Sequence, residues 1–183
     1  MSASTTAETE IANWLADHEA DMIALLEALV NTDSGSYHKE GVDAAGTLIK
    51  EFLETRGVAC DTIPIECHGD ALRATVSGAS SGGNRPIVLM GHRDTVFPRG
   101  EPDRRPFTIR DGRAYGPGVA DMKAGLVMNA FVLAAFTELG GAPAPLVGLF
   151  TGDEEIGSPS SAPVIARETT NARAVFNSEP GRI

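Results

Sequence analysis

Cysteine and positive charge are both scarce in this sequence. The two cysteines, Cys60 and Cys67, cannot build a disulfide framework in a chain of 183 residues, so the cytoplasm is the expected location. Lysine and arginine number 15 against 25 aspartates and glutamates, which gives a formal net charge of −10. An acidic chain repels phosphate backbones, and we therefore expect no nucleic-acid partner. The excess of carboxylates is compatible with metal binding instead.

Long apolar runs are also absent. No run approaches the roughly 20 residues that a membrane span requires, so no membrane partner is expected. The first ten residues have neither the basic nor the apolar region of a signal peptide, and residues 1–10 are expected to form a disordered head. With 42% hydrophobic and 22% charged residues, the composition is typical of a globular chain with the size of one ordinary domain.

Helical patterns occupy four segments. In the first two, apolar residues recur every three or four positions, as on one face of a helix. Gly57 provides a C-cap for the second, and the third ends at a pair of glycines. The expected helices cover residues 7–31, 40–56, 120–139 and 160–168.

Strand patterns separate these helices. Residues 58–66 and 71–78 alternate between apolar and polar side chains, like half-buried strands. Residues 86–91 and 145–150 are continuous apolar runs, which are typical of strands covered on both faces. Residues 172–178 form a third strand-like run of this kind. Buried strands that alternate with helices predict an α/β fold, with a mostly parallel sheet and helices on both faces.

Two further segments predict turns. Residues 107–116 have the pattern of a β-hairpin, with Asp111 and Gly112 at its tight turn. The segment 77–86 is rich in glycine and serine and is expected to connect two strands. It contains the pattern G-x-S-x-G, but a nucleophile elbow requires a helix after the turn, and a strand is expected there.

Polar residues concentrate in four short segments. Three of them, residues 91–96, 151–157 and 177–181, directly follow the buried or strand-like runs, and residues 116–123 precede the longest apolar helix. The carboxyl ends of parallel strands share one edge of a sheet, where α/β proteins bind ligands. The fold is therefore expected to bring these distant segments to one site.

The side chains in these segments point to metal binding. They include His92, Asp94, Asp121, Glu154, Glu155 and Glu179. Carboxylates that share a small volume repel one another unless cations lie between them. Imidazole nitrogen with carboxylate oxygen suits zinc, and also manganese or cobalt, and one carboxylate can bridge two such ions roughly 3.5–4 Å apart. Taken singly, each carboxylate would more often be a solvated side chain, or part of a charge pair at a helix N-terminus. Their joint position at strand ends favours the metal interpretation.

At this level the motifs resemble a known family, the co-catalytic metallopeptidases and amidohydrolases that include carboxypeptidase G, acetylornithine deacetylase, succinyl-diaminopimelate desuccinylase and aminoacylase. The matching segments are GHRDTVFP (91–98), YGPGVADMKAGL (115–126), TGDEEIGS (151–158) and SEPGR (178–182). They follow one another in the family's order. Arg93 stands where the family more usually has an apolar residue, and its side chain is expected to point away from the metals.

The resemblance implies two divalent metal ions, zinc or else cobalt or manganese, and a ligand role for four residues. His92 and Glu179 would bind the first metal, Glu155 would bind the second, and Asp121 would bridge the two. The peptide bond after Asp121 is typically cis in this family. The fold implied is the catalytic domain of zinc exopeptidases.

Two further carboxylates receive catalytic roles from the same resemblance. Asp94 would hold the far nitrogen of the His92 ring, which fixes its tautomer. Glu154 would be the general base that takes a proton from a metal-activated water and returns it to the leaving nitrogen. Glutamate at position 179 favours carboxypeptidases and deacylases over aminopeptidases. The implied substrate is a small acyl-amino acid or peptide, cleaved at an amide bond next to a free carboxylate.

The family's enzymes are considerably longer than this chain. Residues 11–183 are expected to be the N-terminal portion of the catalytic domain, without the lid or dimerisation domain and without the C-terminal segment that supplies a last histidine to the second metal. We therefore expect weak or single-metal binding from this chain, little turnover, and a homodimer only in a full-length form. The alternative hypothesis is a non-catalytic remnant that acts as a metal-binding or interaction module.

Overall fold

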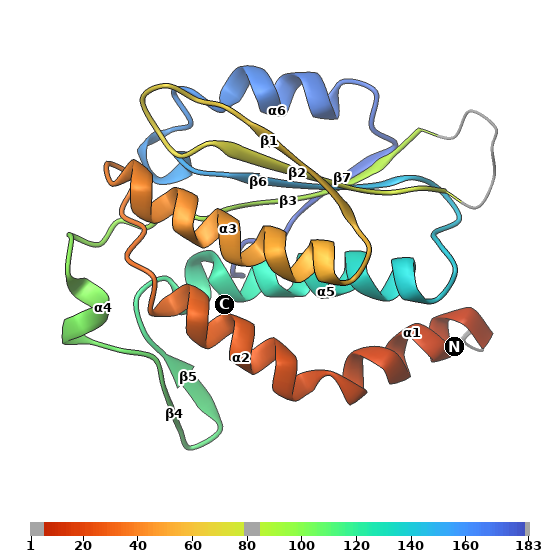
Figure 1. The fold of residues 1–183 in the computed structure, drawn as a ribbon, viewed down its shortest axis with the longest axis horizontal. Helices are drawn as coiled ribbons and strands as arrows, with labels where there is room; N and C mark the ends of the chain where they lie inside the picture. Colours follow the sequence, from red (N-terminus) through yellow and green to blue (C-terminus); the bar gives the residue numbers. More distant parts are fainter. Residues whose placement is uncertain (1–5, 79–84, 182–183) are drawn as a thin grey trace.

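The computed structural model describes residues 6–78 and 85–181. Its centre is a five-stranded sheet with the strand order β1-β2-β6-β3-β7. The strands are β1 (Ala59–Ile63), β2 (Ala71–Val76), β3 (Ile87–His92), β6 (Leu146–Thr151) and β7 (Ala174–Asn177). Helices cover both faces of this sheet (Figure 1), so the predicted α/β class is confirmed.

The pairing within the sheet is mixed. Strand β3 lies parallel to both β6 and β7, which gives the parallel half of the sheet that the apolar runs predict. Strand β2 pairs antiparallel with both β1 and β6. A connection of only a few residues joins β1 to β2, and this is too short for the crossover that a parallel pair requires. The sheet is thus parallel on the side of the polar segments and antiparallel on the other.

Three of the four predicted helices are present near their expected positions. They are α3 (Lys39–Thr55), α5 (Ala124–Glu138) and α6 (Ala162–Thr169). Helices α3 and α5 pack on one face of the sheet and α6 packs on the other (Figure 1). Gly57 has a φ of 78°, as expected for a glycine just beyond the end of α3.

The first predicted helix is instead two helices, α1 (Thr6–Asp17) and α2 (Glu19–Val30), so the prediction of one helix over 7–31 is wrong at His18. In a continuous helix the backbone N–H of His18 would donate to the carbonyl of Trp14. Here the ring Nδ1 of His18 occupies that carbonyl at 2.7 Å, and the backbone N–H turns to Leu15 at 3.2 Å. The His18 side chain therefore uses the Trp14 carbonyl, which a continuous helix would need as a backbone acceptor.

The prediction of a disordered head over residues 1–10 is wrong for residues 6–10. Residues 6–10 form the first turns of α1, which corrects the prediction for that part. Residues 1–5 lie outside the described residues. So does most of the predicted turn over 77–86, because residues 79–84 are not described.

Two hydrophobic cores lie on the two faces of the sheet. The larger contains buried residues of α2, α3 and α5, with Phe131 and Phe150 among its largest side chains. The smaller packs Val164 of α6 against Val88 and Leu149. The described residues include one helical segment, 119–138, that is long and apolar enough to cross a membrane, but 61% of its apolar window is buried inside the protein. Its apolarity therefore reflects its position under the sheet.

A β-hairpin projects from this body, as predicted. Strands β4 (Thr108–Arg110) and β5 (Arg113–Tyr115) form a separate two-stranded sheet. Asp111 and Gly112 both have positive φ, 51° and 70°, which is the requirement of a two-residue hairpin turn. A short helix that the sequence analysis did not predict, α4 (Glu101–Arg104), precedes the hairpin.

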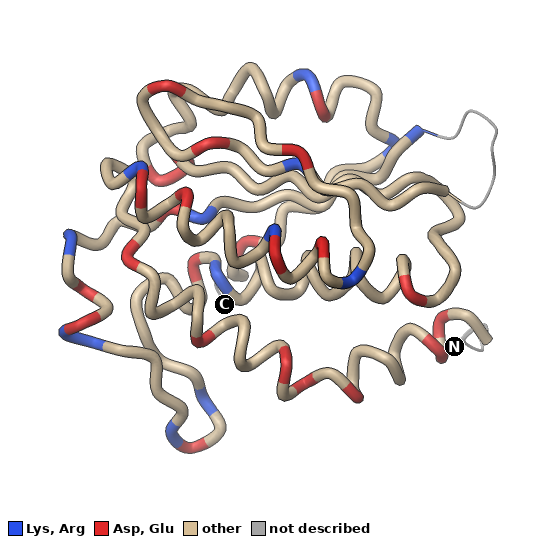
Figure 2. The backbone as a smooth tube through the Cα atoms, viewed as in Figure 1, with Lys and Arg blue, Asp and Glu red and all other residues tan. Residues whose placement is uncertain are grey.

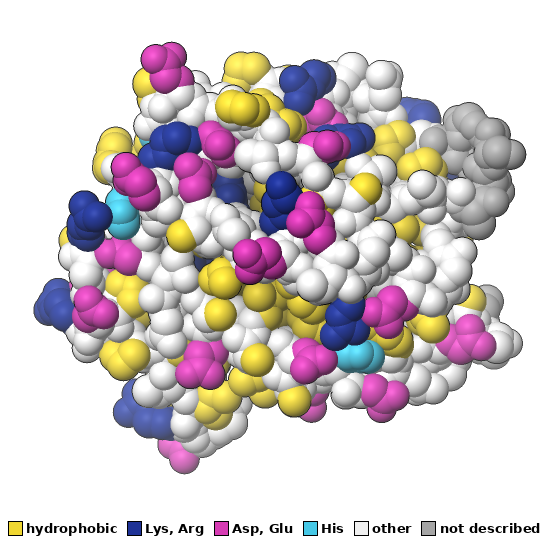
Figure 3. Space-filling model, in the orientation of Figure 1, with side chains coloured by type: hydrophobic (Ala, Val, Ile, Leu, Met, Phe, Trp, Pro, Cys, Tyr) yellow, Lys and Arg dark blue, Asp and Glu magenta, His cyan; other side chains and the backbone are white. Residues whose placement is uncertain are grey.

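Charge is unevenly spread over this acidic chain. Arginines gather on α4 and the hairpin, whereas acidic residues are spread along α1, α2 and α3 (Figure 2). On the face shown in Figure 3, acidic and basic side chains are interspersed around exposed apolar groups.

Candidate metal centre

The three parallel strands end together at one edge of the sheet. Strand β3 ends at His92, which pairs in register with Thr151 at the end of β6, and β7 ends at Asn177. The polar segments that follow these strands are thereby brought together, as the sequence predicts. The fourth segment enters through an irregular helical turn, η1 (Val119–Lys123), whose Met122 accepts a hydrogen bond from the His92 backbone at 3.2 Å.

His92, Asp121 and Glu179 form the centre of this site. One potential ligand atom from each lies within 4.8 Å of the others. The Nε2 atom of His92 is 3.2 Å from Oδ1 of Asp121 and 3.5 Å from Oε1 of Glu179. The imidazole is 1% exposed, whereas the Asp121 and Glu179 side chains are 50% and 33% exposed. The site is therefore closed on the histidine side and open to solvent on the carboxylate side. The peptide bond between Asp121 and Met122 is cis.

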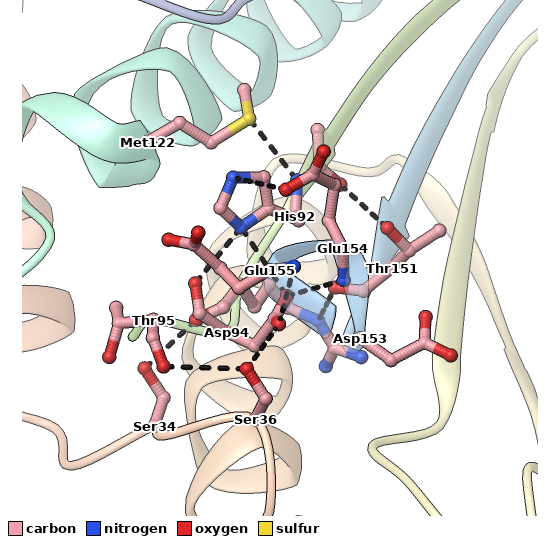
Figure 4. Close-up of polar contacts among 12 residues, drawn as sticks. Ser34, Ser36, His92, Asp94, Thr95, Met122, Thr151, Asp153, Glu154 and Glu155 are labelled. Atoms are coloured by element: carbon pink, nitrogen blue, oxygen red, sulfur yellow. Dashed lines mark hydrogen bonds and ion pairs between the residues drawn. The ribbon is translucent and has the colours of Figure 1, made fainter. Parts of the chain in front are cut away.

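Asp94 lies behind the His92 ring and is fully buried (Figure 4). Its Oδ1 is 3.3 Å from Nδ1 of His92, and that nitrogen is also 2.9 Å from the Asp94 backbone carbonyl. The same carboxylate accepts hydrogen bonds from the backbone N–H groups of Glu154 and Glu155, at 3.1 and 3.2 Å. A proton on Nδ1 therefore faces acceptors, and Nε2 is left free toward Asp121 and Glu179.

The adjacent glutamates of the turn η2 (Glu154–Ile156) face different sides of the ring. Oε2 of Glu154 lies 3.7 Å from Nε2 of His92. Figure 4 shows the carboxylate of Glu155 on the other side, toward Thr95. Among the described residues, the one group of three potential ligands with this close spacing does not contain Glu155. The two neighbouring carboxylates thus lie on different sides of the His92 ring.

The electrostatics of the site reflect its excess of negative charge. Burial alone would lower the pKa of His92, but Asp94 and Glu179 outweigh it and raise that pKa to about 9. Burial raises the pKa of Glu179, and Asp121 and Glu154 raise it further. Burial also raises the pKa of Glu155, with Asp121 and Asp94 adding to the effect. The raised pKa values of Glu155 and Glu179 reflect burial together with repulsion among the carboxylates, and a divalent cation would relieve this repulsion.

The donor set fits a borderline divalent cation. One imidazole nitrogen and two carboxylate oxygens, all reachable from one point, are ligands that zinc, cobalt or manganese accept. The carboxylate of Asp94 stays ionised behind the imidazole, because hydrogen bonds from His92 and Ser36 lower its pKa against the effect of its burial. A histidine backed by such a carboxylate is a common arrangement at metal sites.

Arg93 points away from this site, as expected. Its guanidinium is buried and donates hydrogen bonds to the backbone carbonyls of Thr151, Val42 and Asp70. Burial lowers the pKa of Arg93 to about 10, against the opposing effect of nearby aspartates, so it stays charged at neutral pH. Gly46 of α3 provides space for it, since a Cβ atom there would lie 1.7 Å from Nη1.

Several residues that support the site were not singled out from the sequence. Ser36 donates a hydrogen bond to Oδ2 of Asp94 at 2.7 Å, and Ser34 donates one to the backbone carbonyl of Arg93 at 2.8 Å. Lys123 is buried and caps the end of α2 through the carbonyls of Leu29 and Thr32. The polar run that contains both serines, between two amphipathic helices, is the one signal that could have identified them.

The other three histidines lie elsewhere in the fold. His18 separates α1 from α2, His38 precedes α3, and His68 lies in the turn between β1 and β2. His68 is hydrogen-bonded to Ser160 through Nδ1 at 2.7 Å. Within the described part of the chain, none of the three joins the cluster around His92.

Comparisons with known proteins agree with this geometry. Residues 88–182 match a family model described as Peptidase family M20/M25/M40. The chain is 32% identical over 167 residues to carboxypeptidase G2 of Pseudomonas sp. (strain RS-16), which covers 90% of this chain and 40% of that protein. The chain thus spans about 40% of the length of this curated relative.

Solved structures show the same fold. Human carnosine dipeptidase 1 aligns with a TM-score of 0.78 and 18% identity, over 96% of this chain and 42% of that one. The M20 family metallo-carboxypeptidase Sso-CP2 from Sulfolobus solfataricus aligns with a TM-score of 0.73 and 22% identity, over 88% of this chain and 38% of that one.

Proposed function

This chain belongs to peptidase family M20/M25/M40, and from that premise we propose that it carries metal-binding and proton-transfer residues of a metal-dependent hydrolase. The reaction proposed is cleavage of an amide or peptide bond next to a free carboxylate. The observation that supports it most directly is the cluster of His92, Asp121 and Glu179, with Glu154 beside it.

Two divalent cations, zinc or else cobalt or manganese, are proposed as cofactors. His92, Asp121 and Glu179 would hold the first, while Asp121 and Glu155 would hold the second with one ligand fewer from this chain. Bound metal ions of this kind lower the pKa of a coordinated water toward roughly 7 and polarise a substrate carbonyl.

Residues of the chain would then transfer the protons of the reaction and orient the His92 ring. Glu154 is half-exposed and 3.7 Å from Nε2 of His92, so its carboxylate can reach a proton on the open side of the site. It would take the proton of the attacking water and deliver it to the leaving nitrogen. Asp94 would hold the proton of His92 on Nδ1, so that Nε2 faces the metal.

The substrate proposed is a small acyl-amino acid or peptide. Glutamate rather than aspartate at position 179 supports carboxypeptidase or deacylase chemistry over aminopeptidase chemistry, and the relative named carboxypeptidase G2 is in line with this. We further propose a cytoplasmic location, and a homodimer for a longer form of the protein.

The test is the substitution Glu154→Gln in a form of the protein that turns over an N-acyl amino acid. We expect kcat to fall roughly 10²- to 10⁴-fold with the metal content unchanged, because glutamine cannot accept the proton. Glu51→Gln, on the exposed side of α3, is the matched control and should leave kcat unchanged. Near-normal turnover in Glu154→Gln would refute the assigned role. Metal binding without turnover in every form would favour the metal-binding module instead.

A further inference from the structure

A cavity of about 530 Å³ lies beside the candidate metal centre. One wall is the loop of residues 35–38, which leads into α3, and the other is the segment 95–98, which follows Asp94. Glu40, Arg99, Glu155 and Ile156 complete the lining. Figure 4 shows Glu155 near His92, so one side chain both lines the cavity and borders the metal centre. Its volume is within the range of small-molecule sites in proteins.

Apolar side chains dominate the walls of this cavity. Tyr37 lies on one wall, Val96, Phe97 and Pro98 lie on the other, and Ile156 lies between them. Tyr37 is 86% exposed and Val96 is 66% exposed, so both present large apolar surfaces to solvent. Covering such surfaces with an apolar group removes them from water, which is favourable in proportion to the area covered.

Backbone hydrogen bonds fix the two walls relative to each other. Thr95 donates to the Ser34 carbonyl at 2.9 Å, and the Ser36 N–H donates to the Thr95 carbonyl at 3.2 Å. A Cβ atom on Gly35 would lie 2.7 Å from the Phe97 carbonyl oxygen, so only glycine permits this close approach. The segment that positions Asp94 is therefore the segment that shapes the cavity.

Arg99 adds a guanidinium to the lining, which also contains the carboxylates of Glu40 and Glu155. Among the described residues, no carboxylate lies within 4.0 Å of its guanidinium, since no ion pair involves it. A guanidinium without such a partner can stack on an aromatic ring and repels a cationic group. The guanidinium can therefore stack on an aromatic group, and the preference for such a group rests on this stacking and on the apolar walls.

We propose that this cavity is a specificity subsite that binds an apolar, and best an aromatic, side chain on the substrate residue adjacent to the scissile bond. The inference rests on the proposed function, because it takes the scissile carbonyl to lie at His92, Asp121 and Glu179. A side chain that extends from that point past Glu155 enters the space between Tyr37 and Val96.

Binding of two uncharged probes to the 183-residue chain tests this subsite without requiring turnover. The probes are N-acetyl-phenylalanine methylamide and N-acetyl-alanine methylamide, which lack a free carboxylate and differ only in the side chain. In zinc-loaded protein labelled with ¹⁵N, we expect the phenylalanine probe to bind at least about tenfold more tightly. Its largest amide shift changes should fall on Val96, Phe97 and Ile156. Equal affinities, or shift changes centred elsewhere, would overturn the proposal.

Two substitutions sharpen the test. Val96→Asp places a charge on the apolar wall and should weaken the phenylalanine probe at least about tenfold, whereas Val96→Ile should preserve its binding. Val175→Asp is the matched control, because Val175 is an exposed valine of β7 outside the cavity lining. Equal losses in Val96→Asp and Val175→Asp would count against the subsite.

Failure of the subsite can be distinguished from failure of the proposed function. Hydrolysis of N-acyl amino acids without any aromatic preference would refute the subsite and leave the hydrolase intact. Aromatic binding at Val96 without hydrolysis by any form of the protein would support the subsite and refute the hydrolase.

Discussion

The hydroxyl of Ser36 donates a hydrogen bond over 2.7 Å to Oδ2 of Asp94, a residue 58 positions away in the sequence. Asp94 in turn lies 3.3 Å from Nδ1 of His92. All three residues are buried. Ser36 therefore helps to hold the carboxylate that positions the histidine of the candidate metal centre.

Removing the hydroxyl with Ser36→Ala should weaken zinc binding roughly 10- to 100-fold, the usual effect of losing a supporting hydrogen bond behind a metal ligand. Competition with a chromophoric chelator measures this directly. Ser160→Ala is the control, because Ser160 also bonds to a histidine ring but lies outside the metal centre. If both variants bind zinc like the parent chain, Asp94 does not depend on Ser36.

Metal stoichiometry tests the assignment of ligands. Because His92, Asp121 and Glu179 form one cluster, the 183-residue chain should hold at most one tightly bound zinc ion. Glu179→Gln removes one charged ligand and should weaken that binding at least about tenfold, whereas Glu51→Gln should not. Metal analysis after dialysis gives both results. Two tightly bound ions per chain would contradict the expected ligand set.

The stability of the metal-free chain should fall as the pH rises above neutrality. The pKa of His92 is raised from 6.5 to about 9 in the folded protein. The protonated form is thus favoured by folding, and its contribution is complete below pH 6.5 and is lost as the pH rises through about 9. Between pH 6.5 and 8 the free energy of unfolding should decrease by about 2 kcal/mol.

Urea unfolding at several pH values measures this decrease, and His92→Asn is the control that should flatten it. The range stops at pH 8 because burial lowers the pKa of Lys123 to about 8, and above that pH its titration acts in the opposite direction. Saturating zinc should also remove the pH dependence between 6.5 and 8, since metal binding displaces the proton. If the free energy of unfolding of the parent chain depended on pH as little as that of His92→Asn, the assigned effect of His92 would be contradicted.

The sequence predicts most of the fold because its strands are apolar runs with sharp boundaries. Strands β3 and β6 are buried and coincide with the runs 86–91 and 145–150 to within one residue. The break at His18 could not be predicted, because it depends on whether one ring nitrogen displaces one backbone N–H. Periodicity continues unchanged through that point and carries no sign of the break.

The candidate site, like the fold, could be predicted from the sequence only in part. His92, Asp121 and Glu179 follow from the rule that parallel strands end at one edge, together with the resemblance to a known family. Ser36 does not, because its partner Asp94 is brought to it only by the pairing of the 34–36 loop with the segment after β3. Contacts between a loop and a distant strand end leave no local pattern.

The last prediction concerns Arg93 and Gly46. The buried guanidinium of Arg93 occupies the space that a side chain at position 46 would need. Alanine within a helix is normally more stable than glycine by roughly 1 kcal/mol. Gly46→Ala should nevertheless destabilise the chain by about 2 kcal/mol, because the new Cβ would lie 1.7 Å from Nη1 of the buried Arg93. Thr47→Ala, at the neighbouring exposed position of α3, is the control and should not destabilise it.

The double variant Gly46→Ala with Arg93→Met removes the guanidinium that causes the clash. Methionine is apolar and flexible, and the loss of the hydrogen bonds from Arg93 to three backbone carbonyls is common to the single and the double variant, so it cancels in the comparison. We therefore expect the double variant to be more stable than the sum of the two single changes by at least about 1 kcal/mol, measured by urea unfolding of the metal-free chains. Strict additivity would mean that α3 shifts to accommodate alanine on its own, and that the arginine does not depend on the glycine beneath it.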